Sequence, residues 1–242
     1  SSSNAFSAAV TMIADAGGED FGNITFVDSA GVDLDTSASA DGDLFINAGT
    51  DGAVGGNLSI TATTGNITQV VALAVTGTSS FTTSASNATI GLSTVTTNAF
   101  SSAVTLSTTG SSANVTIDGG TTALILAASS VGGNLTLLDG NASGITDTGT
   151  ITVGGNLSAT TDAGSGVITL DTLAVTGTIA LATNSGGAAI IVNATGIDFA
   201  ASTLTGTLAA TATTGNIIDT GIVSVTSTSN FTTSASNATI TL

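Results

Sequence analysis

The sequence contains no lysine, arginine, histidine, cysteine, proline, tryptophan or tyrosine. Without a basic side chain the protein cannot neutralise phosphates, so nucleic acid is not expected as a partner, and an anionic membrane surface would repel it. The missing histidine and cysteine remove the usual ligands of zinc, haem and iron–sulfur clusters, all disulfides, and the Ser–His–Asp and Cys–His nucleophile systems. No apolar run approaches the ~20 residues that span a bilayer, so we expect no membrane insertion.

The remaining composition is polar but not that of a disordered chain. Of the 242 residues, 78 are serine or threonine, 31 are glycine and 41% are hydrophobic, while the 16 ionisable side chains are all acidic and give a net charge of -16. The apolar share is large enough to form a core. The absence of proline also leaves every backbone N–H free to donate in a β-ladder.

Short segments alternate apolar residues with threonine, serine, asparagine or alanine, which is the pattern of half-buried β-strands. Breaks that contain glycine separate these segments. The only helix candidate, the alanine-rich LILAASS at 124–130, is too short. We therefore predict an all-β chain, with strands among residues 9–13, 23–27, 43–47, 57–61, 103–107, 114–118 and 178–182.

The chain repeats itself. TATTGNI occurs at 61–67 and 211–217, FTTSASNATI at 81–90 and 231–240, VGGNL at 54–58, 131–135 and 153–157, and NAF followed by AVT at 4–11 and 98–105. One longer unit aligns at 65–92, 143–170, 165–192 and 215–242, and its two overlapping copies start 22 residues apart. Phenylalanines recur at a similar spacing, at Phe6, Phe26 and Phe45 and again at Phe81 and Phe100.

A repeat of 22 residues that holds about three short strands predicts a parallel β-solenoid, in which each repeat forms one coil. We expect about 19–25 residues per coil and roughly ten to twelve coils stacked at ~4.8 Å. The inward positions are predicted to be Ile67, Leu73, Val75, Phe81, Ile90 and Leu92. Residues 1–242 are expected to form one continuous segment, a fragment of a longer repetitive chain, with a more acidic section at 1–53 and the clearest repeats at 54–242.

The segments GNLSITATTGNITQ, ALAVTGTSSFTTSASNATI and SSVGGNLTLL resemble repeats of very large bacterial surface proteins of the filamentous-haemagglutinin-like and autotransporter-like class. The resemblance covers most of the chain, most clearly 54–242. It implies a right-handed parallel β-helix, export to the cell surface or beyond, and an adhesive or structural role. It transfers no catalytic residue.

Nine of the 16 acids lie in residues 1–51. Asp33 with Asp35, and Asp41 with Asp43, are two residues apart and can each share one strand face, while Asp20 and Asp41 are one coil apart and can stack. Stacked carboxylates repel unless a cation lies between them, and calcium prefers oxygen ligands. These five residues are therefore the candidate calcium site. The alternative is that they are solvated acids that keep the protein soluble.

Eleven asparagines occupy the N-x-S/T glycosylation pattern. The candidates are Asn23, Asn57, Asn66, Asn87, Asn114, Asn134, Asn141, Asn156, Asn193, Asn230 and Asn237. The alternative is that asparagine begins each strand because solenoid corners favour it.

The T-x-T pairs, such as those at 61–63, 76–78, 150–152 and 211–213, could form the flat array of an ice-binding solenoid, but their spacing is irregular.

The expected function is that of a structural shaft: a non-catalytic, extracellular or cell-surface filament or adhesin segment that stacks end to end into a protease-resistant fibre. Its expected partner is itself, through head-to-tail or lateral assembly. No cofactor other than calcium is expected. The alternatives are an adhesin segment that binds glycans or surfaces, and a polysaccharide-active enzyme that uses two carboxylates. The lack of basic side chains to hold an anionic substrate argues against the enzyme.

Overall fold

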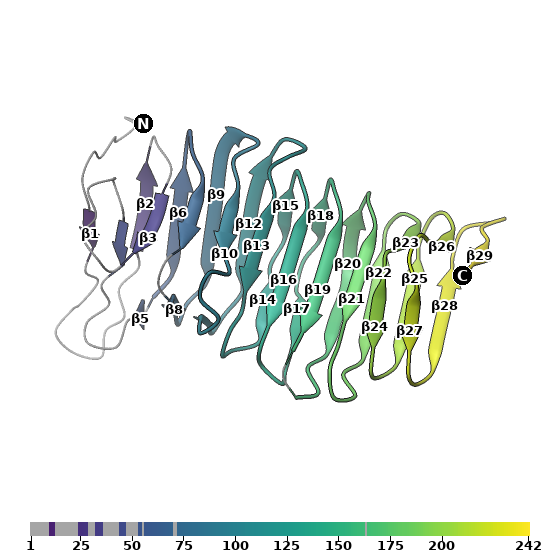
Figure 1. Cartoon of the computed structure of the whole chain (residues 1–242). Coiled ribbons are helices and arrows are strands. Elements are labelled where there is room, and N and C mark those ends of the chain that lie inside the picture. The colour runs from purple at the N-terminus through teal and green to yellow at the C-terminus, as the bar shows by residue number, and fades with distance from the viewer. Residues whose placement is uncertain are drawn as a thin grey trace.

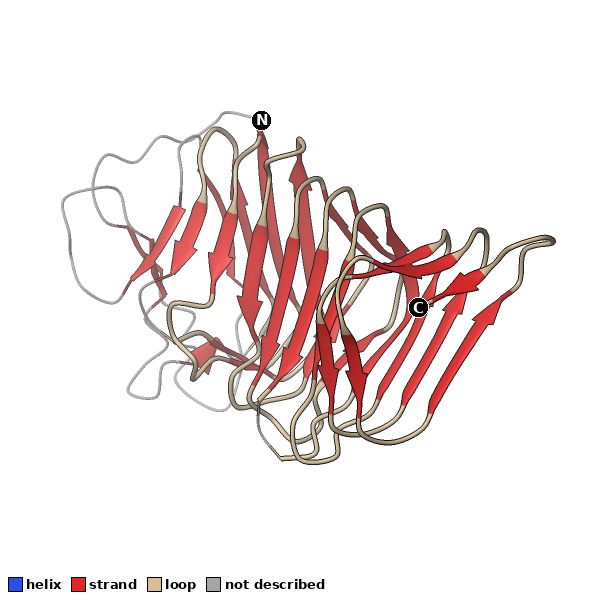
Figure 2. Cartoon of the chain, turned by 45° about the vertical axis from the view of Figure 1, so that its right-hand side comes forward, coloured by secondary structure: helices blue, strands red, loops and turns tan. Residues whose placement is uncertain are grey.

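The computed structural model describes residues 10–12, 24–28, 32–35, 44–46, 53–54, 56–69, 72–162 and 164–242. Within these residues every regular element is a β-strand, and the strands of successive coils pair in parallel (Figures 1 and 2). No helix long and apolar enough to cross a membrane is found in this part of the chain. The all-β solenoid predicted from the repeats is confirmed.

The strands form three sheets that run along the axis of the solenoid. Sheet 1 has 14 strands: β1 (Val10–Met12), β3 (Val32–Asp35), β4 (Leu44–Ile46), β7 (Ile67–Gln69), β10 (Ile90–Leu92), β13 (Val115–Asp118), β16 (Leu135–Asp139), β19 (Leu157–Thr161), β21 (Ile179–Ala182), β23 (Ile197–Phe199), β24 (Ser202–Leu204), β26 (Ile217–Asp219), β27 (Val223–Val225) and β29 (Ile240–Thr241). Sheet 2 has 12 strands: β2 (Ile24–Asp28), β6 (Leu58–Ala62), β9 (Ser79–Ser86), β12 (Val104–Thr109), β14 (Leu124–Leu126), β15 (Ser129–Val131), β17 (Ile145–Asp147), β18 (Ile151–Val153), β20 (Ile168–Val175), β22 (Ala189–Asn193), β25 (Leu208–Ala212) and β28 (Ser229–Thr233). Sheet 3 has three strands: β5 (Ala53–Val54), β8 (Ala74–Val75) and β11 (Ala99–Phe100).

The side chains alternate between the core and the surface, as a period of two requires. All six residues predicted to point inward are buried, with exposed fractions of 2% or less. They belong to one hydrophobic cluster that runs through the coils from Phe26 to Ile217. Outward positions carry ladders of small polar residues, such as Thr136 between Thr116 and Ser158. Each coil therefore buries its apolar face against its neighbours rather than against itself.

The sequence repeats follow the winding. From β6 to β29, partner residues in adjacent coils are 19–25 residues apart, from Ala189↔Leu208 to Ser79↔Val104. The two FTTSASNATI copies begin in β9 and β28, which both belong to sheet 2. The copies therefore lie on the same sheet, but the coil-to-coil pairs lead from Phe231 back to Ser79, so the two copies differ in register by two residues.

The predicted number of coils was too high. The described residues make about eight turns instead of ten to twelve. Near the N-terminus, Ile24 pairs with Leu58 and Val32 with Ile67, so these partners are 34 and 35 residues apart. Extra residues between the paired strands lengthen this coil and lower the number of turns.

The phenylalanine spacing is not a coil repeat. Phe26 lies in β2 of sheet 2, whereas Phe45 lies in β4 of sheet 1. Phe81 pairs with Leu106 in sheet 2, and Phe100 pairs with Val75 in sheet 3. The rings of Phe81 and Phe100 nevertheless meet edge to face inside the core, with centroids 6.2 Å apart. Phe6 lies outside the described residues.

The glycines of the VGGNL segments at 131–135 and 153–157 lie at a corner where a side chain would clash with the preceding coil. A Cβ on Gly155 would lie 2.3 Å from Oδ1 of Asn134 and 2.9 Å from the backbone of Gly133 in the preceding coil. Oδ1 of Asn114 accepts the N–H of Asn134, Oδ1 of Asn134 accepts the N–H of Asn156, and both donor–acceptor distances are 2.8 Å. This asparagine ladder continues the backbone pairing around the corner.

Candidate functional sites

Three of the five candidate calcium ligands, Asp20, Asp41 and Asp43, lie outside the described residues. Asp33 and Asp35 lie in β3, whose backbone pairs with Thr68 in β7 and Phe45 in β4. Among the described residues, no group of three or more acids is arranged to hold a metal ion.

A different set of acids stacks at the end of sheet 1. Asp118 ends β13, Asp139 ends β16, and Asp162 directly follows β19, so the three lie in successive coils. The Asp139 carboxylate packs on Gly119, because a Cβ there would lie 2.7 Å from Oδ1 of Asp139. Asp162 sits over Gly140 in the same way, at 3.5 Å. We call Asp118, Asp139 and Asp162 the acid column.

Two members of the acid column are buried. Asp118 is 7% exposed, and its Oδ1 accepts the N–H of Gly120 at 2.8 Å. Asp139 is 2% exposed, and neither of its carboxylate oxygens has a hydrogen bond of normal geometry among the described residues. An unsatisfied buried carboxylate is costly, so the neutral, protonated form is favoured.

The surroundings of Asp139 therefore favour its neutral, protonated form. Burial raises the pKa of Asp139 to about 7, the charges of Asp118 and Asp162 raise it further, and the nearby N–H of Asn141 opposes the rise. Burial also raises the pKa of Asp118. In the next coil Thr161, the ladder partner of Asp139, donates its hydroxyl to the carbonyl of Gly166. A neutral O–H donor thus occupies the same position in the neighbouring coil.

The acid column was missed in the sequence, although its signal is present. The spacing used to pair Asp20 with Asp41 also fits Asp118, Asp139 and Asp162, which are 21 and 23 residues apart. Each also breaks an alternating strand at its end, in TIDGG, LLDGN and TTDAG. Acids at strand ends usually indicate solvated turns, so burial could not be expected from the residue type alone.

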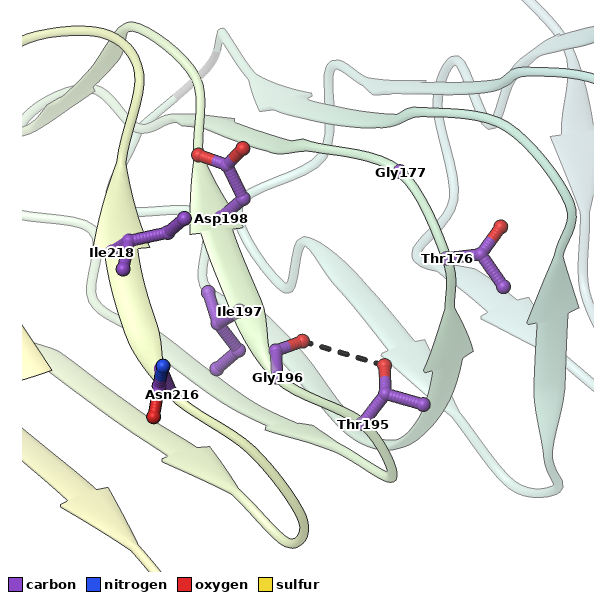
Figure 3. A pocket seen from close by; sticks show the side chains of 8 residues that line it. All are labelled: Thr176, Gly177, Thr195, Gly196, Ile197, Asp198, Asn216 and Ile218. Carbon is purple, nitrogen blue, oxygen red and sulfur yellow. Dashed lines mark hydrogen bonds between the residues drawn. The ribbon is translucent and has the colours of Figure 1, made fainter. Parts of the chain in front are cut away.

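A shallow groove of about 320 Å³ opens on the wall of the solenoid, beside the turn at Thr176 and Gly177 and over β23 and β26 (Figure 3). It is lined by Thr176, Gly177, Thr195, Gly196, Ile197, Asp198, Asn216 and Ile218. Asp198 and Ile218 are ladder partners, and Oδ1 of Asp198 is buried without a hydrogen-bond partner among the described residues. The groove offers hydroxyl, amide and carboxylate groups, which can hydrogen-bond to sugar hydroxyls.

Neither described groove brings two carboxylates together. Asp198 is the single acid that lines the first groove, and Asp171 is the single acid that lines a second groove of about 180 Å³. Glycoside hydrolysis by the usual mechanism needs two carboxyl groups on either side of the scissile bond. The two grooves therefore lack the carboxylate pair that the enzyme alternative requires.

The candidate glycosylation sites differ in their environment. Asn193 is fully buried, and its Nδ2 donates to the carbonyls of Val175 and Gly196 and to Oγ1 of Thr195. A glycan on this nitrogen would have to displace these bonds, so Asn193 is removed from the set of candidates. Asn141 is half-buried, and Asn23 lies outside the described residues. The exposed candidates are Asn57, Asn66, Asn87, Asn114, Asn134, Asn156, Asn230 and Asn237.

Several of these asparagines also have a structural role, as the corner alternative predicted. Oδ1 of Asn57, Asn66 and Asn156 accepts a backbone N–H from the next coil, from Thr78, Thr89 and Thr178 respectively.

The T-x-T pairs do not align into an array. Thr61 pairs with Thr82 on one side but with Val27 on the other, and Thr211 pairs with Thr232 on one side but with Val192 on the other. Valine therefore interrupts the row of threonines in both places.

A family model described as repeats of unknown function (DUF5649) matches residues 21–107, 112–182 and 186–242. No curated protein and no solved structure matches the chain.

Proposed function

This chain belongs to the DUF5649 family of repeats, and we propose that it is the non-catalytic structural shaft of an extracellular or cell-surface filament or adhesin. The single observation that carries the proposal is the continuous core. One hydrophobic cluster passes through every coil from β6 to β26, and Val223, Val225 and Phe231 of the last coil pack against it. Such a core can lengthen by one coil at a time without a change of design.

The surface supports a mechanical role. Its ladders of threonine, serine and asparagine carry no basic residue, so trypsin-like proteases have no cleavage site in the chain. Backbone groups in the corners are also bonded from coil to coil, as at Gly77 N–H to Gly56 O and Gly155 N–H to Gly133 O. Backbone that is held in this way leaves few segments for a protease to bind in extended form.

The adhesin class and the extracellular location rest on the resemblance of the repeats to bacterial surface proteins. Two features support them. The repeats resemble those of exported proteins over most of the chain, and an acidic surface without lysine or arginine remains soluble outside the cell.

The shaft proposal is tested by shape and by protease resistance. Negative-stain microscopy and small-angle X-ray scattering should show rods that lengthen in steps as the protein concentration rises. Proteinase K, which does not need basic residues, should leave the region 56–242 largely intact. Compact globules of fixed size, together with rapid digestion, would contradict the proposal.

A second candidate function is glycan binding, favoured by the groove around Asp198. The groove has no aromatic platform, so we expect weak binding that depends on hydrogen bonds. A glycan array with the purified chain tests this, with Asp198→Ala as the matched variant. Binding that survives this substitution would assign glycan recognition to another surface.

A further inference from the structure

Four turns of the solenoid are closed by the hydroxyl of a buried threonine. Each threonine lies at or near the end of a strand, and its Oγ1 donates to the carbonyl two residues before the next strand begins. The donor–acceptor pairs are Thr83 to Ala88 at 3.3 Å, Thr108 to Ala113 at 2.9 Å, Thr161 to Gly166 at 2.9 Å and Thr183 to Gly187 at 2.6 Å. The first two turns lead from sheet 2 to sheet 1 and the last two lead back, so both corners use the same device.

Asp139 occupies this donor position in its own coil. It ends β16 and pairs with Thr161 in the next coil, and Thr183, which directly follows β21, stands one coil further. The next strand, β17, begins two residues after Ser143, so the matching carbonyl is that of Ser143. Asp139 is buried, as the four threonines are. The position therefore holds a side chain whose neutral form has one O–H donor and whose charged form has none.

The turn that follows β16 is folded around Asn141. Oδ1 of Asn141 accepts the N–H of Ser143 at 2.8 Å, and its carbonyl accepts the N–H of Gly144 at 3.0 Å. Nδ2 of Asn141 also donates to the carbonyl of Thr121 in the preceding coil at 2.7 Å. The carboxyl of Asp139 lies buried at the start of this turn, and its two oxygens have no hydrogen bond of normal geometry among the described residues. A proton on one of these oxygens supplies the donor that a threonine supplies elsewhere.

We propose that the protonated carboxyl of Asp139 closes the turn 140–144 by donating its O–H to the carbonyl of Ser143, and that loss of this proton opens the turn. The neutral acid then takes the part of the threonine hydroxyl in the next coil. The carboxylate can only accept hydrogen bonds, so it repels the carbonyl that it faces. This turn is thus a pH-sensitive latch, whereas the turns closed by threonine do not titrate. The inference goes beyond the proposed shaft function and does not rest on it.

The groups around Asp139 keep the latch closed in weak acid. Burial is the largest effect and, with the neighbouring charges, raises the pKa of Asp139 to about 7. These charges are Asp118 at the end of β13 in the preceding coil and Asp162 directly after β19 in the next one. Asp147 of β17 instead accepts the backbone N–H groups of residues 171 and 172. No basic side chain exists to pair with the carboxylate, so the latch opens as the pH rises through neutrality.

The neighbouring coils do not replace the bond, but they confine the change to the turn. Gly119, the neighbour of Asp139 in the preceding coil, has no side chain, and Thr161 in the next coil uses its hydroxyl within its own turn. The backbone at the end of β16 is bonded on both sides. The N–H of Gly119 donates to Leu138 at 2.9 Å, and that of Asp162 donates to Asp139 at 3.2 Å. The strand therefore stays paired while the turn opens.

Hydrogen exchange in the wild type tests the latch. After correction for the intrinsic effect of pH on exchange, the protection of the Ser143 and Gly144 N–H groups should fall by about tenfold between pH 5 and pH 8. The N–H of Gly187 is the internal control, because it donates to Asn184 at 2.9 Å in a turn that Thr183 closes. Its protection should not change. Equal losses in the two turns overturn the proposal, as does an unchanged protection in both.

Two variants separate the hydrogen bond from the burial of a charge. Asp139→Thr keeps an O–H donor that does not titrate, so the turn should be well protected at both pH values. Asp139→Val has nearly the same shape without the hydroxyl, so its turn should be as poorly protected as that of the wild type at pH 8. Equal protection in the two variants overturns the hydrogen bond.

A third variant moves the latch to another turn. Thr183→Asp, made in the Asp139→Thr chain, should transfer the pH dependence to the N–H of Gly187, because a carboxyl then closes that turn. Protection of Gly187 that stays independent of pH in this chain overturns the assignment of the latch to the donor position. If a variant does not fold, the comparison of the two turns within the wild type decides.

Discussion

Asp139 shows how a single residue of the solenoid can depend on pH. Its carboxyl is buried without a satisfied oxygen, and burial raises its pKa to about 7 from the ordinary value of 3.8. The folded protein therefore binds a proton more tightly than the unfolded chain does. The associated stability is fully present below the unfolded pKa and is lost as the pH rises through the folded pKa.

We expect the free energy of unfolding to fall between about pH 4 and pH 7, by at most about 3 kcal/mol from Asp139 alone. Asp139→Asn is neutral at every pH and should remove most of this decline. Urea titrations of the wild type and the variant across this range would measure it, with the exposed Asp219→Asn as the control for net charge. Parallel profiles for wild type and Asp139→Asn would show that Asp139 titrates normally.

Gly155 shows how closely the coils approach at the asparagine corner. A Cβ at this position would lie 2.3 Å from Oδ1 of Asn134 and 2.9 Å from the backbone of Gly133. Gly155→Ala should therefore destabilise the fold by about 1–3 kcal/mol through overpacking. Gly91→Ala is the matched control, because the nearest atom lies 4.0 Å away and the equivalent position in the last coil is Thr241. Similar thermal midpoints for the two variants would mean that the corner can relax.

At the scale of one strand, β20 carries a bulge that the preceding coil holds in place. The register with β22 shifts between Leu170 and Leu173. Across the bulge, Asp147 Oδ1 accepts the N–H of Asp171 at 3.0 Å. Its Oδ2 accepts the N–H and the hydroxyl of Thr172 at 3.0 Å and 2.6 Å. The bulge lets the end of β20 turn to pair with β18, so Asp147 fixes where the strand bends.

Asp147→Ala should lower the free energy of unfolding by about 1–3 kcal/mol, because three charge-assisted hydrogen bonds are lost. Water can reach this site and replaces these bonds in part. The loss should be local, so hydrogen exchange at the amides of residues 171 and 172 should accelerate more than exchange elsewhere. Asp198→Ala is the control, because Oδ1 of Asp198 accepts no hydrogen bond among the described residues. Uniform acceleration over all coils would contradict a local role.

The strands could be predicted wherever apolar residues alternate with small polar ones. The expected segment 114–118 is observed as Val115–Asp118, and 178–182 as Ile179–Ala182. The same rule fails for Asp118 and Asp139, which end their strands inside the protein although the residue type indicates solvent. Asp118 is held by the N–H of Gly120, and Asp139 packs on Gly119 of the preceding coil. A contact between two coils cannot be predicted from the sequence of one strand alone.

At the scale of the whole molecule, the period of the repeats was predictable and the number of turns was not. The copies at 81–90 and 231–240 both begin in strands of sheet 2, as expected for equivalent parts of two coils. The phenylalanines at 26 and 45 imitate the period but lie in different sheets. A distance in sequence equals one coil only where no residues are inserted, and the pairing of Ile24 with Leu58 shows such an insertion.

The stacking of coils along one axis predicts that identical substitutions differ in cost with their distance from the end. Phe81 and Phe231 have the same neighbours in sequence, but Phe81 is fully buried between two coils and Phe231 is half-buried in the last one. Phe81→Ala should cost about 3–5 kcal/mol, as for a fully buried ring. Phe231→Ala should cost less than half as much, because it removes contacts with one coil only.

Urea unfolding of both variants in dilute solution measures this difference. Equal costs for the two substitutions would contradict a core in which the stability of each ring depends on the number of coils that it contacts.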